Sequence, residues 1–315
     1  MIVNQKKTPL KEIPEDWFTS SDKLASEAER VVRPSQSYWQ DSWSRLRKNK
    51  LAMVGLVFLI LLVFMAIFGP IISPHSYDEQ VLANQNQPPS VEHWFGTDEL
   101  GRDVFARTWE GARISLFVGF MAALIDLIVG AIYGGVAGYR GGKTDAAMMR
   151  FVEILYGIPY LLIVILLMVV MGPGLWTIII ALTVTGWLGM ARIVRGQVLQ
   201  IKNYEFVLAS KTFGTSTSRI IRKNLLPNTM GVIIVQMTLS VPSAIFAEAF
   251  LSFLGLGIQP PLASWGSMVN SALPVILSGD WWRLFFPALF ISLTMFSFNV
   301  LGDGLQDALD PKLRR

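Results

Sequence analysis

The chain has 315 residues, of which 52% are hydrophobic and only 16% are charged, and its mean hydropathy is +0.46. This balance excludes an ordinary soluble domain with a few buried helices. There are no cysteines, which excludes disulfides, thiolate chemistry and cysteine metal sites, and the net charge of +4 is explained by contact with anionic lipid and does not indicate nucleic acid.

Six apolar stretches are long enough to cross a lipid bilayer as helices. A hydrocarbon core needs roughly 20 mostly apolar helical residues, and backbone amides in lipid must find partners within their own segment. The stretches are residues 51–72, 114–137, 146–171, 175–190, 230–256 and 285–301. The sequence therefore predicts an all-α polytopic membrane protein with six transmembrane helices.

Basic residues predict the orientation of this bundle. Lys and Arg accumulate in cytoplasmic loops near span ends, and here they are concentrated before the first span, around the second link, in the fourth link and at the C-terminus. The first link, 73–113, is instead rich in Asp and Glu, and it belongs outside together with 257–283. We predict a multi-pass protein of the cell membrane with both termini in the cytoplasm.

Two features that can indicate catalysis lack the context that catalysis needs. Residues 137–144 read Ala-Gly-Tyr-Arg-Gly-Gly-Lys-Thr, a relaxed phosphate-binding loop, but such a loop follows a strand and this one links two spans. His75 and His93 both lie in the external link, away from a nucleophile and without zinc-type spacing, so they are interpreted as loop residues. We predict no catalytic site, no metal site and no ATP hydrolysis by this chain.

Three acidic residues, Asp126, Glu153 and Glu248, fall within the spans. Ionisable groups are costly in hydrocarbon, so each is expected to face protein or a water-filled cavity, and a translocation path is the first hypothesis. Pairing or capping between helices is an alternative that the sequence leaves open for all three. Glu153 also lies one helical turn from Arg150.

The fourth link, 192–228, is long for a helical bundle, where connections usually run about 2 to 8 residues. Residues 204–213 are predicted to form a short helix that presents Phe206, Val207 and Phe213. Gly214 follows and tolerates a left-handed turn. The first element of this link is therefore an apolar helix that ends at a glycine.

A second short helix is predicted after the glycine. Thr215 or Ser216 can cap it, and it is expected to end before Pro227, because the residue that precedes a proline resists helical geometry. This helix is basic. The pair of helices is interpreted as a docking surface outside the membrane, with an interfacial helix on anionic headgroups as the alternative.

This segment is similar to the cytoplasmic coupling helix of ABC importer permeases, whose general form is Glu-Ala-Ala, three residues, Gly, and later Leu-Pro. The corresponding residues here are Leu208, Ala209, Ser210, Gly214, Leu226 and Pro227. The acid stands three residues earlier, at Glu205, on nearly the same helical face. Asn224 occupies a position where Ile is typical.

Further stretches resemble the C-type permease subunit of oligopeptide and dipeptide importers. They are residues 93–103 (His-Trp-Phe-Gly-Thr-Asp-Glu-Leu-Gly-Arg-Asp), 111–116, 251–257, 260–266 and 298–311. The resemblance extends from about residue 43 to the C-terminus. It implies a type I ABC importer permease fold. Residues 1–42 would form a polar cytoplasmic segment, and 43–113 the first span and external loop. The permease core would be 114–302, with its coupling segment at 203–227, followed by a cytoplasmic tail at 303–315.

The resemblance also implies partners. Such a chain forms a heterodimer with a B-type permease subunit, is driven by two cytoplasmic ATP-binding subunits that use ATP and Mg²⁺, and receives peptide from an external substrate-binding protein. It would bind no cofactor itself. Glu205, Ala209, Ser210, Gly214, Leu226 and Pro227 would transmit ATPase closure to the bundle. Two alternatives remain at this stage: import of nickel or a related substrate, and an ion-coupled secondary transporter that uses the three membrane acids.

Overall fold

Helices make up most of the computed structural model, which describes residues 37–309. The chain divides into two units, Met1–Asp41 and Ser42–Arg315. The polar segment predicted at 1–42 lies almost entirely outside the described residues, and so does the end of the tail predicted at 303–315. The helices described below belong to the second unit, except for the first turn of α2.

The described elements are α2 (Tyr38–Lys48), α3 (Lys50–Ile72), η2 (Leu82–Asn84), α4 (Val104–Arg140), α5 (Gly142–Tyr156), α6 (Tyr160–Met171), α7 (Leu175–Ile201), α8 (Glu205–Thr212), α9 (Thr217–Ile220), η3 (Ile221–Leu225), α10 (Leu226–Phe253), α11 (Trp265–Ala272), η4 (Leu273–Ser278) and α12 (Trp282–Leu309). Between residues 37 and 309, five helices are long and apolar enough to cross a membrane, or six if the bent pair α5 and α6 counts as one span. The predicted all-α membrane fold is confirmed.

The predicted span over 146–171 is a bent pair of helices. α5 and α6 meet at an angle of 78° across a short break. The break contains Gly157 and Pro159, and Pro159 precedes the first residue of α6. A proline disfavours helical geometry in the residue before it, so Ile158 interrupts the helix and the chain turns.

Several helices are longer than the apolar stretches that predicted them, because hydropathy marks the part in lipid and not the ends of the helix. α4 begins at Val104, where the Asp103 side chain accepts a hydrogen bond from the backbone N–H of Ala106 at 2.7 Å. α7 continues to Ile201 and α12 to Leu309, well past the predicted ends.

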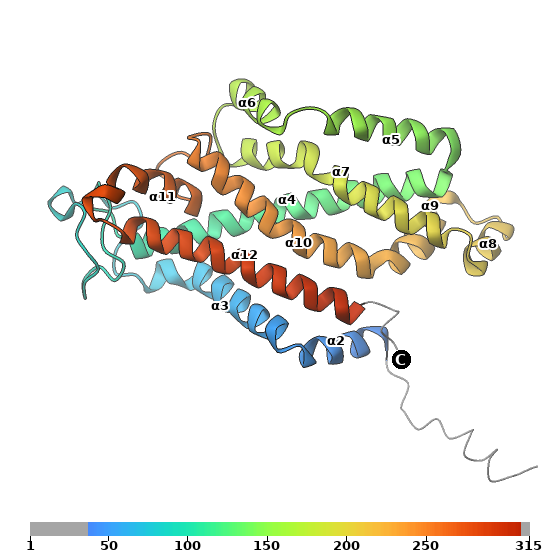
Figure 1. Ribbon diagram of the computed structural model, residues 1–315, viewed down its shortest axis with the longest axis horizontal. Helices are drawn as coiled ribbons and strands as arrows, with labels where there is room; N and C mark the ends of the chain where they lie inside the picture. The colour runs from blue at the N-terminus through green and yellow to red at the C-terminus, as the bar shows by residue number, and fades with distance from the viewer. Residues whose placement is uncertain (1–36, 310–315) are drawn as a thin grey trace, which may run out of the picture. The chain divides into compact units, whose positions relative to one another are not determined.

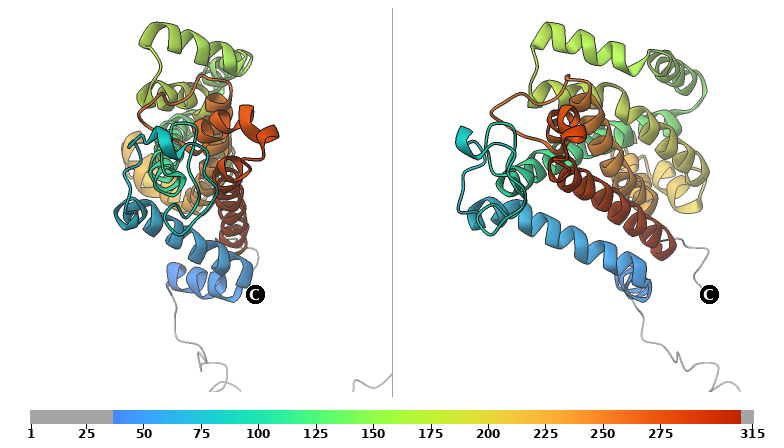
Figure 2. Two further views of the ribbon diagram at one scale, coloured as in Figure 1. Left: turned by 90° about the vertical axis from the view of Figure 1, so that its left-hand side faces the viewer. Right: turned by 60° about the vertical axis from the view of Figure 1, so that its left-hand side comes forward.

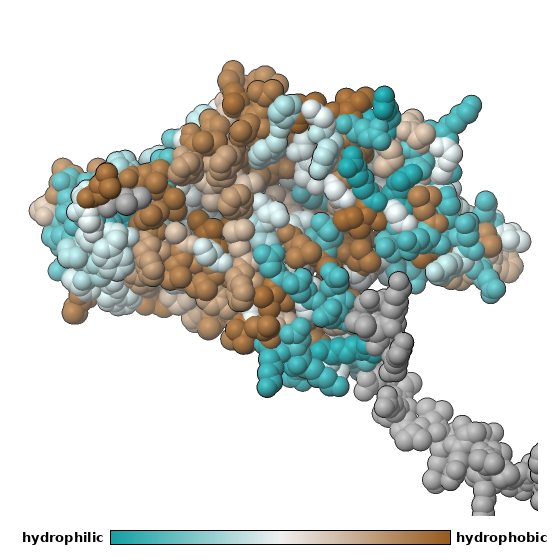
Figure 3. All heavy atoms as spheres, in the orientation of Figure 1, coloured by the Kyte–Doolittle hydropathy of each residue, from teal (hydrophilic) through white to brown (hydrophobic). Residues whose placement is uncertain are grey.

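The long helices of the second unit run side by side and place different structures at their two ends (Figures 1 and 2). The loop that joins α3 to α4 lies with α11 at one end, while α8 and α9 protrude at the other. α3 begins and α12 ends at the α8 end. On the face drawn in Figure 3, hydrophobic residues gather over the middle of the bundle, and hydrophilic residues are concentrated toward the α8 end.

α4 and α7 pack closely because glycines line their contact. Gly130, Gly134 and Gly138 recur every fourth residue on α4, so they share one face. A Cβ atom at Gly134 would lie 2.2 Å from the carbonyl oxygen of Ala191 on α7. Small residues at this spacing let helix backbones approach closely in membranes. The sequence analysis did not use this pattern.

The loop that joins α3 to α4 is fixed onto α4 and α12 by buried charges. Asp98 accepts from Arg102 at 2.7 Å and pairs with Arg107 of α4 at 3.3 Å, and all three side chains are buried. Arg283 of α12 pairs with Glu99 in the same loop. Each buried charge has an opposite partner, which offsets its desolvation. The loop is therefore a rigid part of the bundle end.

Candidate functional site

The predicted coupling segment protrudes from the bundle as an exposed helix. Every residue of α8 is exposed or half-exposed except Val207, which is buried in a hydrophobic cluster that includes residues of α7, α9, η3 and α10. Glu205 and Ala209 are exposed, as are Phe206 and the following Phe213, which is 87% exposed. The prediction that Val207 presents apolar surface is wrong, because Val207 is the anchor that holds the helix down.

Gly214 adopts the left-handed backbone predicted for it, with φ +72°. The turn is closed by two hydrogen bonds, from the Gly214 N–H to the carbonyl oxygen of Lys211 at 3.0 Å and from the Thr215 N–H to that of Ser210 at 3.1 Å. A Cβ at Gly214 would meet no atom within 4 Å. The glycine is therefore required by its backbone conformation and not by crowding.

A side-chain hydrogen bond connects α8 to the helix that follows. The amide nitrogen Nδ2 of Asn224 in η3 donates to Ser210 Oγ at 2.9 Å, and Ser210 Oγ in turn donates to the carbonyl oxygen of Phe206 at 2.9 Å. These two residues stand where Ala and Ile are typical in the resembled motif. The two departures from the motif therefore form a contact with each other, which the motif by itself does not indicate.

The second short helix was predicted to end before Pro227. It instead continues without a break into α10. From Thr217 to Phe253 the helix is unbroken, and Ser216 stands at its N-cap without a side-chain capping bond. The turn Ile221–Leu225 is a π-helix in which the Leu226 N–H reaches back five residues to the carbonyl oxygen of Ile221. A regular α-turn would press the proline ring against the carbonyl four residues earlier, and the wider turn relieves this clash.

The three membrane acids do not form one site. Glu153 is exposed and pairs with Arg150 at 3.2 Å. Glu248 is fully buried, and its two carboxylate oxygens accept from Ser252 at 2.7 Å and from Ser115 at 3.2 Å. It thus joins α10 to α4, the structural role that the sequence left open. Asp126 is buried beside a cavity between α4, α6, α7 and α10.

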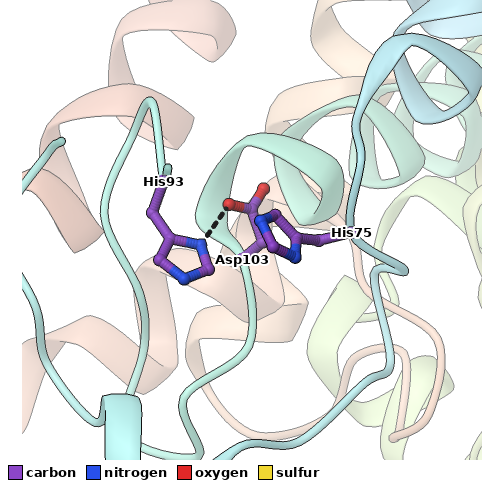
Figure 4. A group of neighbouring side chains, drawn as sticks. All are labelled: His75, His93 and Asp103. Atoms are coloured by element: carbon purple, nitrogen blue, oxygen red, sulfur yellow. Dashed lines mark hydrogen bonds and ion pairs between the residues drawn. The ribbon is translucent and has the colours of Figure 1, made fainter. Parts of the chain in front are cut away.

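His75 and His93, interpreted as loop residues, both lie in the loop that joins α3 to α4, and they are in contact (Figure 4). Their rings stack with centroids 4.4 Å apart, and His93 Nδ1 donates to Asp103 Oδ2 at 2.9 Å. His75 Nε2 donates to the carbonyl oxygen of Glu92 at 3.2 Å. Because Asp103 also caps α4, the His93 contact fixes the loop to the start of that helix. The spacing of these residues in sequence did not indicate the cluster.

The glycine-rich stretch at 137–144 has none of the geometry of a phosphate-binding loop. Ala137 to Arg140 form the last turn of α4, and Gly142 begins α5, so a helix stands where the motif requires a strand. Lys202 of the fourth link donates to the carbonyl oxygen of Gly138 at 3.0 Å. This stretch is a helix-to-helix turn held by Lys202, the residue that follows α7.

Apolar helices of spanning length, a polar loop fixed at one end and an exposed helix and turn at the other define a multi-pass membrane protein of the transport-permease class. The chain belongs to the family described as binding-protein-dependent transport system inner membrane component, whose model matches residues 127–315. Residues 37–89 match a second model, the N-terminal TM domain of oligopeptide transport permease C.

Curated relatives and solved structures agree with this family. The chain is 74% identical over 304 residues to the dipeptide transport system permease protein DppC of Bacillus subtilis (strain 168), covering 96% of this chain and 95% of the relative. It is 58% identical to the oligopeptide transport system permease protein OppC of the same organism, covering 97% and 100%. An inward facing structure of the MetNI methionine ABC transporter covers 66% of this chain and 96% of its own, with a TM-score of 0.52 and 21% identity, and it shows the shared fold.

Proposed function

We propose that this chain is the permease subunit of an ATP-driven importer of dipeptides or oligopeptides. The observation that carries the proposal is the exposed helix α8 with its Gly214 turn, at the end of the bundle opposite the charged loop. In this assignment α8 docks on a cytoplasmic ATP-binding subunit. The names of the relatives favour peptides over the nickel alternative.

The assembly follows from the same assignment. A B-type permease subunit completes the translocation path, two ATP-binding subunits use ATP and Mg²⁺, and an external binding protein delivers the peptide. This chain contributes no ATPase site of its own. Both termini are cytoplasmic, which is supported by the position of α8, the start of α3 and the end of α12 at one end of the bundle.

Coupling works through the contacts already described. Val207 holds α8 in a hydrophobic cluster shared with α7, η3 and α10, and the Ser210–Asn224 hydrogen bond joins α8 to η3. Closure of the ATP-binding subunits moves α8, and the unbroken helix from Thr217 to Phe253 carries the movement into the membrane. The bundle thereby changes between inward-open and outward-open arrangements.

Co-purification of the complete importer tests the docking step. Phe213→Ala removes an aromatic ring that is 87% exposed in the isolated chain, and loss of a well-packed aromatic anchor costs about 2 kcal/mol, or roughly 30-fold in affinity. Leu277→Ala is the matched control, because its side chain is 99% exposed and η4 lies away from α8. Glu205→Lys is expected to weaken the same association. Unchanged recovery of ATP-binding subunits with both α8 variants would refute the docking assignment.

A further inference from the structure

A cavity of about 450 Å³ opens between α4, α6, α7 and α10. Among the described residues that line it, only Asp126 is charged, and Gly186 and Ser243 are exposed, so the cavity opens at the protein surface. The remaining polar residues of its wall are Tyr160, Thr185, Gln236 and Ser240. Ala122, Leu182 and Leu239 contribute apolar surface. A cavity that combines apolar surface with converging polar groups is a common form of small-molecule site.

Two polar atoms of this wall are buried and have no hydrogen-bond partner within residues 37–309. They are Asp126 Oδ1 and Tyr160 Oη. A buried polar atom without a partner costs about 1–3 kcal/mol, and more when the group is charged. Both atoms belong to residues of the same cavity wall, so a ligand held in the cavity would offer partners for both.

The backbone makes room for the carboxylate. A Cβ atom at Gly186 of α7 would lie 2.1 Å from Asp126 Oδ2, so only glycine fits against this side chain. Neither Glu153 nor Glu248 shares the cavity, because one is exposed beside Arg150 and the other is held by serine hydroxyls. A chain of acids suited to an ion or proton path is therefore not formed by these three residues, which counts against the secondary-transporter alternative.

From this geometry we infer that the cavity binds the primary ammonium group of a translocated peptide, with Asp126 accepting from the ammonium and Tyr160 bonding to the adjoining peptide unit. The inference rests on the proposed function, since it names the part of the peptide that this chain holds. A divalent metal ion is a poorer fit, because Ca²⁺ takes six to eight oxygen ligands and Mg²⁺ a near-ideal octahedron, whereas this wall supplies one carboxylate. No Lys, Arg or His among the described residues lines the cavity, so the carboxylate end of the peptide is not recognised there.

Uptake by the complete importer in proteoliposomes tests the inference. Two probes differ in one group: trialanine, which carries the ammonium, and propionyl-dialanine, which lacks it. The expected result for Asp126→Asn is a fall of at least tenfold in kcat/KM for trialanine and less than twofold for propionyl-dialanine. Wild type and Asp126→Asn are each measured with both probes and with the same binding protein. The preference of the binding protein therefore cancels when the loss for trialanine is divided by the loss for propionyl-dialanine. Asp126→Glu should recover most of the trialanine rate.

Glu153→Gln is the control variant, because it also removes one acidic charge from a span but lies outside the cavity. It should leave both rates unchanged. Equal losses for the two probes in Asp126→Asn would mean that Asp126 only supports packing, and would overturn the inference. A wild-type importer that takes up neither probe nor any other peptide would instead refute the proposed function.

A second measurement does not require a variant that folds or a binding protein that accepts both probes. Dicyclohexylcarbodiimide modifies carboxyl groups in apolar surroundings, and mass spectrometry of the wild-type importer then locates the product. Asp126 should be modified, Glu248 should not because its oxygens are occupied and fully buried, and trialanine or propylamine should slow the modification of Asp126 at least threefold. Modification that neither amine slows would overturn the inference.

Discussion

Replacing Gly214 by valine tests whether the turn after α8 has to keep its shape for transport. Gly214 has φ +72°, and a left-handed conformation costs an L-residue roughly 1–2 kcal/mol, with β-branched residues as the most unfavourable cases. Nothing lies within 4 Å of an added Cβ, so the whole cost is conformational. A change of about 1–2 kcal/mol alters the population of the observed turn by about 5–30-fold.

The effect should appear in coupling and not in folding, because the turn is exposed and contributes nothing to the buried core. The assay is the number of peptides imported per ATP hydrolysed by the reconstituted importer, together with its melting temperature. Gly214→Val should lower peptides per ATP about fivefold or more, with a melting temperature close to that of the wild type. Gly214→Asn should recover coupling, because asparagine tolerates left-handed backbone.

Gly196→Val is the matched control. Gly196 lies inside α7 with an ordinary backbone conformation and no atom within 4 Å of an added Cβ, so the same side chain is introduced without strain. Wild-type peptides per ATP in Gly214→Val would show that the turn conformation does not matter for coupling, and the reasoning would be refuted. An equal loss in Gly196→Val would show that the assay responds to valine and not to the turn.

Three further predictions concern contacts within the chain. Gly134→Ala forces a Cβ against a carbonyl oxygen on α7 and should destabilise the bundle by about 1–3 kcal/mol, seen as a lower melting temperature in detergent; an unchanged melt would contradict the close packing. Glu248→Ala removes the carboxylate that accepts from the Ser115 and Ser252 hydroxyls and should cost about 1–3 kcal/mol in stability, whereas Glu248→Gln should cost less, and equal melts for the two would be the contrary result. Ser210→Ala should reduce peptides per ATP because it leaves the Asn224 amide without its partner at a cost of about 1 kcal/mol, and adding Asn224→Ile should restore most of the loss; additive losses would rule out the link.

The membrane class could be predicted because long apolar stretches report directly on the lipid. The break between α5 and α6 follows from a local backbone constraint at Pro159, whereas hydropathy averages over 146–171 and gives neither the angle of the break nor the ends of the two helices. Pro227 was predicted to end a helix. The π-helical turn Ile221–Leu225 avoids the clash between the proline ring and the preceding turn, so the helix continues.

The segment at 203–227 was singled out by its motif, but its contacts depend on three-dimensional packing. Whether Val207 faces inward or outward depends on how α8 sits against α9 and η3, which periodicity over eight residues does not fix. The three acids illustrate the same point, because their sequence context is similar and their surroundings differ: solvent and an arginine for Glu153, serine hydroxyls for Glu248, a cavity for Asp126. The glycine spacing on α4 was readable from the sequence and was missed.

The helix from Thr217 to Phe253 is continuous, so a tilt at one of its ends moves the other end. Its 37 residues span about 55 Å at a rise of 1.5 Å per residue. A tilt of one degree at the end beside α8 therefore displaces the far end by roughly 1 Å on this length. Three residues that line the cavity lie partway along this helix, namely Gln236, Ser240 and Ser243. Under the proposed function, small rotations imposed at the α8 end would thus change the width of the cavity mouth.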